Sequence, residues 1–241
     1  MDWQAHRREA HALGRIQENL KQIIYGGNDG IVTTFAIVAG FAGAQADGVA
    51  QIGGMAVLVF GLANLFADAV SMGLGEFLSL RSQHDLYHAR RASEMHEIIQ
   101  NPNQEQVELF EILRQRGMPP GEADTTANIM SRHPEIMADL MMTYEFGMFD
   151  PTKENPAVNG VVTFVAFVNF GAVPLLPYFL MDPTRTTFHV SVLATVAALT
   201  ALGLLRWNAT GEGLARSILE TVAVGAVCAV VAYYVGWLVG G

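Results

Sequence analysis

The sequence predicts an all-α, polytopic membrane protein with five transmembrane helices and a cytoplasmic helical domain inserted between the second and the third. Two observations support this fold class. The 241 residues are 51% hydrophobic and only 15% charged, with a mean hydropathy of +0.29, which is too apolar for a typical soluble domain. Five segments also reach the roughly 20 apolar residues that a helix needs to cross a bilayer.

The five expected spans are residues 23–46, 52–75, 155–181, 186–205 and 217–241. Three of them carry one ionised side chain each, which is Asp29 in the first, Asp68 in the second and Glu220 in the fifth. A carboxylate in the bilayer costs roughly 2.5 to 3.5 kcal/mol on insertion scales. Asp29, which lies among glycines in the first span, is therefore expected to have a function.

The distribution of Lys and Arg predicts the orientation, because basic loops stay in the cytoplasm. Four basic residues lie in the tail 1–21, seven in residues 81–156, and two in the loop between the fourth and fifth spans. The tail and residues 81–156 are thus expected in the cytoplasm and the C-terminus outside. Residues 22–80 and 157–241 would form the membrane part, and the lack of a targeting extension favours a bacterial inner membrane.

The segment between the second and third spans differs in character, since residues 81–154 hold 13 acidic and 7 basic side chains. Without a helix breaker before Gln100, the second span is expected to continue as one long helix to that residue, where Asn-Pro-Asn ends it. Asn103 is expected to cap the next helix. A later helix is expected to begin at Pro134, which suits a first turn.

Two glutamate pairs in this segment could bind a divalent metal ion. Glu94 and Glu97 are three residues apart on one helix, and Glu105 and Glu108 are three apart on the next, so each pair shares a helical face. Four carboxylates from two antiparallel helices would suit Mn²⁺, Fe²⁺ or Ca²⁺. The alternative is a solvated acidic face.

The last helix of the acidic segment adds Met141, Met142 and Glu145, with Met141 and Glu145 four residues apart. A thioether ligand favours transition metals over Ca²⁺, although Met141 could equally fill the core. His84 and His88, also four apart, and His96, which flanks Glu97, could bind a metal or could be solvated.

A second constellation lies in the membrane. Asn64, Asp68, Met72 and Glu76 recur every four residues, so they form one stripe along the second span. With about 1.5 Å of rise per residue, Asp29, Asp68 and Met72 fall in the same inner third of the bilayer, with Glu76 at the cytoplasmic mouth. Carboxylates at one depth on neighbouring helices favour a cation pathway over a structural polar cluster.

Four segments together resemble the vacuolar iron transporter family. They are YGGNDGIVTTFAIVAGFAGA (residues 25–44), AVSMGLGEFLSLRSQ (69–83), VPLLPY (173–178) and GLARSILETVAVGA (213–226). The resemblance covers nearly the whole chain after the first 20 residues. It departs at Asn64 and Gln22, where plant members of the family carry carboxylates. With so few residues before the first span, the chain is expected to lack the ferritin-like N-terminal domain of some bacterial relatives.

The resemblance implies a homodimer that exports Fe²⁺, possibly Mn²⁺, from the cytoplasm in exchange for protons. It implies metal ligands in the acidic segment at the matching positions Glu94, Glu97, Glu105, Glu108, Met141, Met142 and Glu145. It further implies that Asp29 and Met72 line the pathway, where Asp68 and Glu76 could substitute for the missing carboxylates. The metal would be the substrate, and neither a prosthetic group, nor a nucleic-acid partner, nor enzymatic activity is expected.

Two other functions use the same residues. A metal sensor or store tethered to the membrane would need the glutamates of the acidic segment but not Asp29 or Met72. Ferroxidase chemistry at these carboxylates is a third interpretation, but the sequence does not show the Glu-x-x-His pattern of ferritin-type di-iron bundles.

Overall fold

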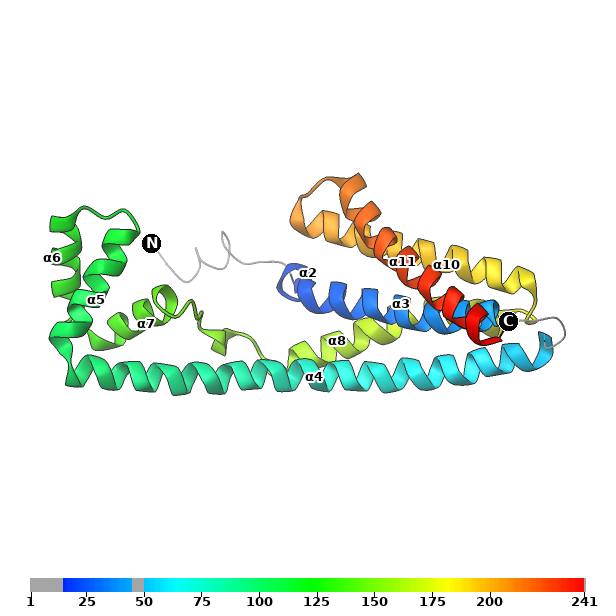
Figure 1. The fold of residues 1–241 in the computed structure, drawn as a ribbon, viewed down its shortest axis with the longest axis horizontal. Helices are drawn as coiled ribbons and strands as arrows, with labels where there is room; N and C mark the ends of the chain where they lie inside the picture. Colours follow the sequence, from blue (N-terminus) through cyan, green and yellow to red (C-terminus); the bar gives the residue numbers. More distant parts are fainter. Residues whose placement is uncertain (1–14, 45–49, 241) are drawn as a thin grey trace. The chain divides into compact units, whose positions relative to one another are not determined.

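The computed structural model describes residues 15–44 and 50–240, and within these ranges the chain forms helices and no strand (Figure 1). The helices fall into two compact units. We call Met1–Phe77 with Ala157–Gly241 the apolar unit, and Leu78–Pro156 the acidic unit. Each unit is described separately below.

The helices follow the expected order along the chain. The apolar unit contains α2 (Arg15–Glu18), α3 (Leu20–Gly43), the first part of α4 (Ala50–Gln100), α8 (Pro156–Gly171), the 3₁₀ turn η2 (Val173–Leu175), α9 (Leu176–Leu180), α10 (Arg185–Thr210) and α11 (Leu214–Gly240). The acidic unit contains the rest of α4, α5 (Pro102–Gln115), α6 (Pro120–Met130), α7 (Pro134–Tyr144) and the 3₁₀ turn η1 (Pro151–Lys153).

Among the described residues, four helical segments are long and apolar enough to cross a membrane. They are Gly54–Gln100, Pro156–Leu180, Arg185–Thr210 and Leu214–Gly240. The expected first span corresponds to α3, which is 24 residues long but is not among the four. Its Gly-Gly-Asn-Asp-Gly stretch lowers its hydropathy, so the expectation that α3 crosses the membrane stays a prediction.

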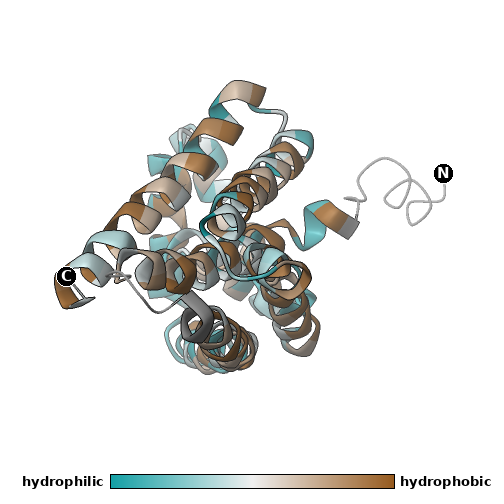
Figure 2. Cartoon of the chain, turned by 90° about the vertical axis from the view of Figure 1, so that its right-hand side faces the viewer, coloured by the Kyte–Doolittle hydropathy of each residue, from teal (hydrophilic) through white to brown (hydrophobic). Residues whose placement is uncertain are grey.

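Helix α3 lies inside the apolar unit. Ile31 packs against Ala198, Leu199 and Leu202 of α10, and on other turns Phe35, Val38 and Ala39 pack against Val57 of α4 and Leu175 of η2. In α11, by contrast, the buried residues are Ser217, Thr221 and Gly225, and hydrophobic colour covers most of its length (Figure 2). A helix enclosed by other helices can be less apolar than one that faces lipid.

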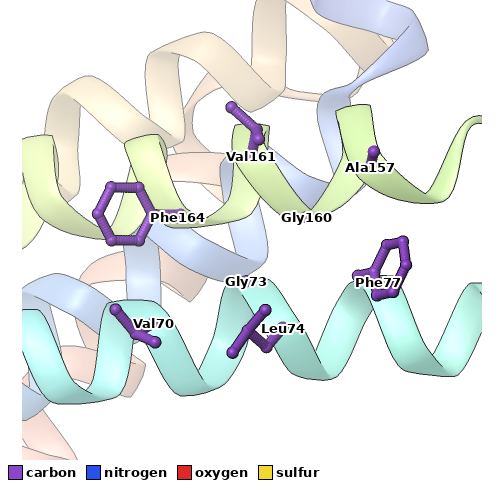
Figure 3. Close-up of a pocket in the computed structure, with 8 residues that line it drawn as sticks. All are labelled: Val70, Gly73, Leu74, Phe77, Ala157, Gly160, Val161 and Phe164. Atoms are coloured by element: carbon purple, nitrogen blue, oxygen red, sulfur yellow. The ribbon is translucent and has the colours of Figure 1, made fainter.

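Glycines allow the close approach of neighbouring helices in this unit. A Cβ at Gly26 of α3 would lie 2.7 Å from the carbonyl oxygen of Thr163 on α8, and one at Gly73 of α4 would lie 2.9 Å from that of Gly160. Figure 3 shows Gly73 and Gly160 facing each other across α4 and α8. Small residues at such contacts bring backbones together in membrane proteins.

An apolar cavity of about 400 Å³ adjoins this glycine contact (Figure 3). Its lining is formed by Val70, Gly73, Leu74, Phe77, Ala157, Gly160, Val161 and Phe164. Because all of these side chains are apolar, the cavity is unsuited to a cation.

The acidic unit is built around one apolar cluster that joins its helices. The buried members are Ile98, Leu109, Ala127, Met137, Ala138 and Met141. The helix boundaries agree with the expected end at Gln100 and the expected start at Pro134. The expected cap at Asn103 is wrong, because α5 begins with Pro102 in its first turn and Asn101 as the N-cap residue. The amide of Asn101 instead donates to Glu97 at 2.9 Å.

Candidate metal sites

The polar residues of the expected pathway lie on α3 and α4 of the apolar unit. The Asn64 amide donates a hydrogen bond of 2.6 Å to the Asp68 carboxylate, one turn along α4. Asp29 on α3 is close enough to Asp68 for the two carboxylates to repel each other. Met72 packs against the buried cluster of Leu65, Ala69 and Phe167. The structure therefore joins Asn64 to Asp68 by a hydrogen bond and places Asp29 within electrostatic range of Asp68, with Met72 one turn further along α4.

Glu76, the last member of the stripe, binds two residues from the start of α3. The Gln22 amide donates to Glu76 Oε1 at 3.0 Å, and the Lys21 ammonium lies 3.4 Å from the same oxygen. Gln22 is only 3% exposed. Sequence reasoning did not identify these two partners, although both residues immediately precede the expected first span and thus lie at the depth assigned to Glu76.

In the acidic unit, Glu94 and Glu105 come together from α4 and α5. They are 7% and 4% exposed, and Glu94 Oε1 and Glu105 Oε2 are buried without a donor among the described residues. A buried carboxylate without a partner is costly. When one of the two carries a proton, a hydrogen bond between the carboxyl groups satisfies them, and a bound cation would do so as well.

The remaining glutamates lie nearer to the surface. Glu97 is exposed and accepts the Asn101 hydrogen bond, while Glu108 is half-buried and accepts one from Gln104 at 3.0 Å. Glu145 forms the C-cap of α7. All three interact electrostatically with Glu94 or Glu105, so five carboxylates from α4, α5 and α7 gather in one region.

Burial and mutual repulsion shift the proton affinity of this cluster. Burial, followed by the charges of Glu105 and Glu145, raises the pKa of Glu94 to about 7. Burial and the Glu108 charge raise the pKa of Glu105. Partial desolvation and the Glu108 and Glu105 charges raise that of Glu145. The cluster therefore favours the binding of positive charge, either as protons or as a metal ion.

The carboxylates lie near one another but do not form a complete metal-coordination site. In the part of the chain that the structure describes, no group of three or more His, Cys, Asp or Glu side chains is already arranged to hold a metal ion. Met141 and Met142 are fully buried, and Met141 belongs to the apolar cluster of the unit. Metal binding would thus require glutamate side chains to converge, and Met141 has a packing role whether or not it is a ligand.

Three arginines fix the position of α7, which carries the two methionines. Arg91 on α4 donates to Glu135 at 2.7 Å and to Asp139 at 2.8 Å. Arg90 lies 4.0 Å from the centroid of the Phe146 ring, just after α7. Arg116, at the end of α5, lies 4.1 Å from that of the Tyr144 ring. These contacts tie both ends of α7 to its neighbours.

The other polar residues singled out in the sequence lie elsewhere. The Nε2 atom of His84 is buried without a partner in the described residues, whereas His88 and His96 are exposed. Glu220 of α11 forms ion pairs with Arg206 at 2.9 Å and Arg216 at 2.8 Å. The lone carboxylate of the fifth expected span therefore has a structural explanation.

In residues 15–44 and 50–240 the chain is helical, and four of its helices are long and apolar enough to cross a membrane. With carboxylates on its apolar helices, the chain is an integral membrane protein. The chain belongs to the VIT family, whose profile matches residues 20–237. It is 33% identical to vacuolar iron transporter 1 of Arabidopsis thaliana over 228 residues, which covers 95% of this chain and 88% of that protein.

Two further relatives show similar agreement. Vacuolar iron transporter 1 of Oryza sativa subsp. japonica is 33% identical over 216 residues, covering 90% of this chain and 83% of the relative. The vacuolar iron transporter of Plasmodium falciparum is 31% identical over 237 residues, covering 95% and 84%. The family's members are transporters, not enzymes.

Proposed function

We propose that this protein is a divalent transition-metal transporter that exports Fe²⁺, and also Mn²⁺, from the cytoplasm in exchange for protons. The observation that carries the proposal is a set of polar residues on two helices of the apolar unit. Asp29 on α3 lies within electrostatic range of Asp68 on α4, Asn64 donates to Asp68, and Met72 and Glu76 follow on α4. Carboxylates inside an apolar helical unit cost free energy, and a cation pathway would explain why they are there. The relatives, named iron transporters, support iron as the substrate.

In this proposal α3 is the first of five transmembrane helices and joins the four that are already long and apolar enough to cross a membrane. Its glycines and Asp29 lower its hydropathy, but α4, α8, α10, α11 and η2 contribute side chains that pack around it. The N-terminus and the acidic unit would face the cytoplasm of a bacterial cell, as the basic residues predict. Glu76, with Lys21 and Gln22, would then stand at the cytoplasmic mouth.

The protein would act as a homodimer. Asn64 and Asp68 are half-exposed along a face of α4 on which Ala63, Phe66 and Ala67 are exposed. A groove lined by α3, α4 and α11 also reaches Asn64. Because lipid cannot satisfy a carboxylate and an amide, a second copy of the chain is a suitable cover for this face, and the pathway would run along it.

The acidic unit would collect the metal. Its carboxylates supply the oxygen ligands that Fe²⁺ and Mn²⁺ accept, with Glu94, Glu97, Glu105, Glu108 and Glu145 as the candidates. Met141 and Met142 would add soft sulfur ligands. The buried oxygens of Glu94 and Glu105 without donors support this assignment.

Metal flux into proteoliposomes tests the proposal. With an acidic interior and Fe²⁺ kept reduced outside, the wild type should take up iron and release protons, and Asp29→Ala should abolish uptake while iron binding to the acidic unit persists. Asp182→Ala, which removes a carboxylate from the loop before α10, is the matched control and should transport normally. A wild type that binds iron but carries none would indicate a sensor or store. Normal transport by Asp29→Ala would refute the role of that carboxylate.

A further inference from the structure

The contacts of Glu76 differ from those of the other carboxylates of the stripe, because a cation already lies beside it. Lys21 Nζ and Gln22 Nε2 both contact Oε1, at 3.4 Å and 3.0 Å. The side chain of Glu76 is 15% exposed, whereas that of Lys21 is 73% exposed. A mostly covered carboxylate is thus held by one mobile charged donor and one buried neutral donor.

We propose that Lys21 is a tethered competitor for the transported metal at Glu76 and sets the affinity of the cytoplasmic entrance. This inference rests on the proposed function, in which Glu76 is the first pathway ligand. An ammonium and a divalent cation cannot share one carboxylate at contact distance, because two positive charges a few ångströms apart repel each other. Lys21 must therefore leave Glu76 when the metal arrives.

The structure suits this exchange. Lysine has a long, flexible stem and a strongly hydrated head, and with most of its surface exposed Lys21 can move into water at little cost. Neither donor uses Oε2 of Glu76, so that oxygen can receive the incoming ion first. The ammonium can then leave Oε1.

Gln22, the second donor to Glu76, orients the carboxylate and does not compete with the metal for it. It is neutral and buried, so it does not compete with a cation. Its amide fixes the orientation of the Glu76 carboxylate whether Lys21 is bound to that carboxylate or has left it. Gln22 is a positioning residue, and Lys21 is the residue that determines affinity.

A competitor at the entrance has a use in transport. An ion must bind strongly enough to enter a pathway but weakly enough to move on. By returning to Glu76, Lys21 lowers the affinity of the first site and helps to release the metal toward Met72 and Asp29. Its removal should therefore change KM more than kcat.

Mn²⁺ uptake into proteoliposomes of the full chain, measured as a function of Mn²⁺ concentration, tests the inference. Lys21→Gln should lower KM about two- to fivefold, the range that the strength of an exposed ion pair allows, with kcat within about twofold. Lys21→Arg, which retains the charge, should keep the wild-type KM. Arg216→Gln is the matched control, because its side chain is 72% exposed and is paired to a different carboxylate, that of Glu220.

The outcomes separate the possible explanations. An unchanged KM in Lys21→Gln would overturn the inference while leaving the transporter itself intact. If Arg216→Gln lowered KM as much as Lys21→Gln, the inference would also fail, because the effect would then come from the general surface potential. If the wild type carries no Mn²⁺ or Fe²⁺ at all, the proposed function fails, and the role of Lys21 fails with it.

Discussion

The Asn64 amide donates to the Asp68 carboxylate within α4, at a distance of 2.6 Å between Nδ2 and Oδ2. Asp68 thereby has a neutral donor on one side and the repelling carboxylate of Asp29 on another. A carboxylate at position 64 would add a second repulsion. The amide instead holds Asp68 in place without adding charge.

Replacing Asn64 should weaken metal transport through Asp68. In Asn64→Leu the carboxylate loses a hydrogen bond to a charged group, an interaction worth about 1.5 to 3 kcal/mol, and should adopt several orientations. We expect KM for Mn²⁺ uptake to rise about three- to tenfold, as a partial loss of that energy predicts. Asn169→Leu on α8, whose amide donates to its own helix backbone at Val165, should leave KM unchanged.

Removing Arg91 should loosen α7. Arg91→Ala breaks two ion pairs from α4 to α7, with Glu135 and Asp139, and we expect amide hydrogen exchange across residues 134–144 to accelerate about tenfold, corresponding to roughly 1.4 kcal/mol. Mn²⁺ binding to the acidic unit should weaken in parallel. Arg114→Ala, which removes an ion pair within α5 to Glu111, is the control and should change neither quantity. Unaltered exchange in Arg91→Ala would show that apolar packing alone positions α7.

Glu94→Gln should make the metal-free protein more stable and should weaken its binding of metal. The substitution removes a buried charge that Glu105 and Glu145 repel, and the new amide can donate to Glu105. At pH 8 we expect the acidic unit to gain on the order of 2 kcal/mol, measured by hydrogen exchange of α5 and α7. Its Mn²⁺ affinity, measured by calorimetry on the same samples, should fall at least tenfold. If Glu94→Gln lowered both the stability of the acidic unit and its Mn²⁺ affinity, charge repulsion at Glu94 would not be the cause of the instability.

The metal-free acidic unit should lose stability as the pH rises. The pKa of Glu94 is about 7 in the folded protein, against an ordinary value of 4.5, so the folded state binds a proton more tightly than the unfolded state. The resulting stabilisation is fully present below pH 4.5 and disappears as the pH passes through 7. Exchange in α5 and α7 should therefore be slower at pH 5.5 than at pH 8 after correction for intrinsic rates, and Mn²⁺ at pH 8 should restore the protection. The Glu94→Gln variant should show a smaller pH effect.

Much of the fold could be predicted because local rules determine it. An uninterrupted sequence carries α4 to Gln100, and Pro134 begins α7, since proline lacks the amide proton that a first turn does not need. The common depth of Asp29 and Asp68 in the bilayer, which helical rise predicts, stays a prediction, although the two carboxylates lie within electrostatic range of each other. The same local rules misplaced the cap of α5, where Pro102 in the first turn makes Asn101 the N-cap residue.

The tertiary partners could not be predicted, because they depend on which helices become neighbours. The pattern of α3 does not reveal that other helices enclose it, nor that its first turn holds Glu76. Arg91 forms ion pairs with Glu135 and Asp139, which lie 44 and 48 positions later in the sequence. No sequence periodicity indicates contacts over such separations. The choice of metal likewise depends on ligand geometry that spacing does not specify.

The enclosure of α3 has a consequence for biosynthesis. Helix α3 is made early, but α10, which covers Ile31, begins about 140 residues later. At roughly 5 to 20 residues per second, the ribosome needs about 7 to 28 s to supply that partner. During this interval the nascent chain holds an incompletely covered helix with Asn28 and Asp29, and insertion factors and membrane proteases can act on it. Mutations in α10 should therefore lower the yield of inserted protein before they affect any transport rate.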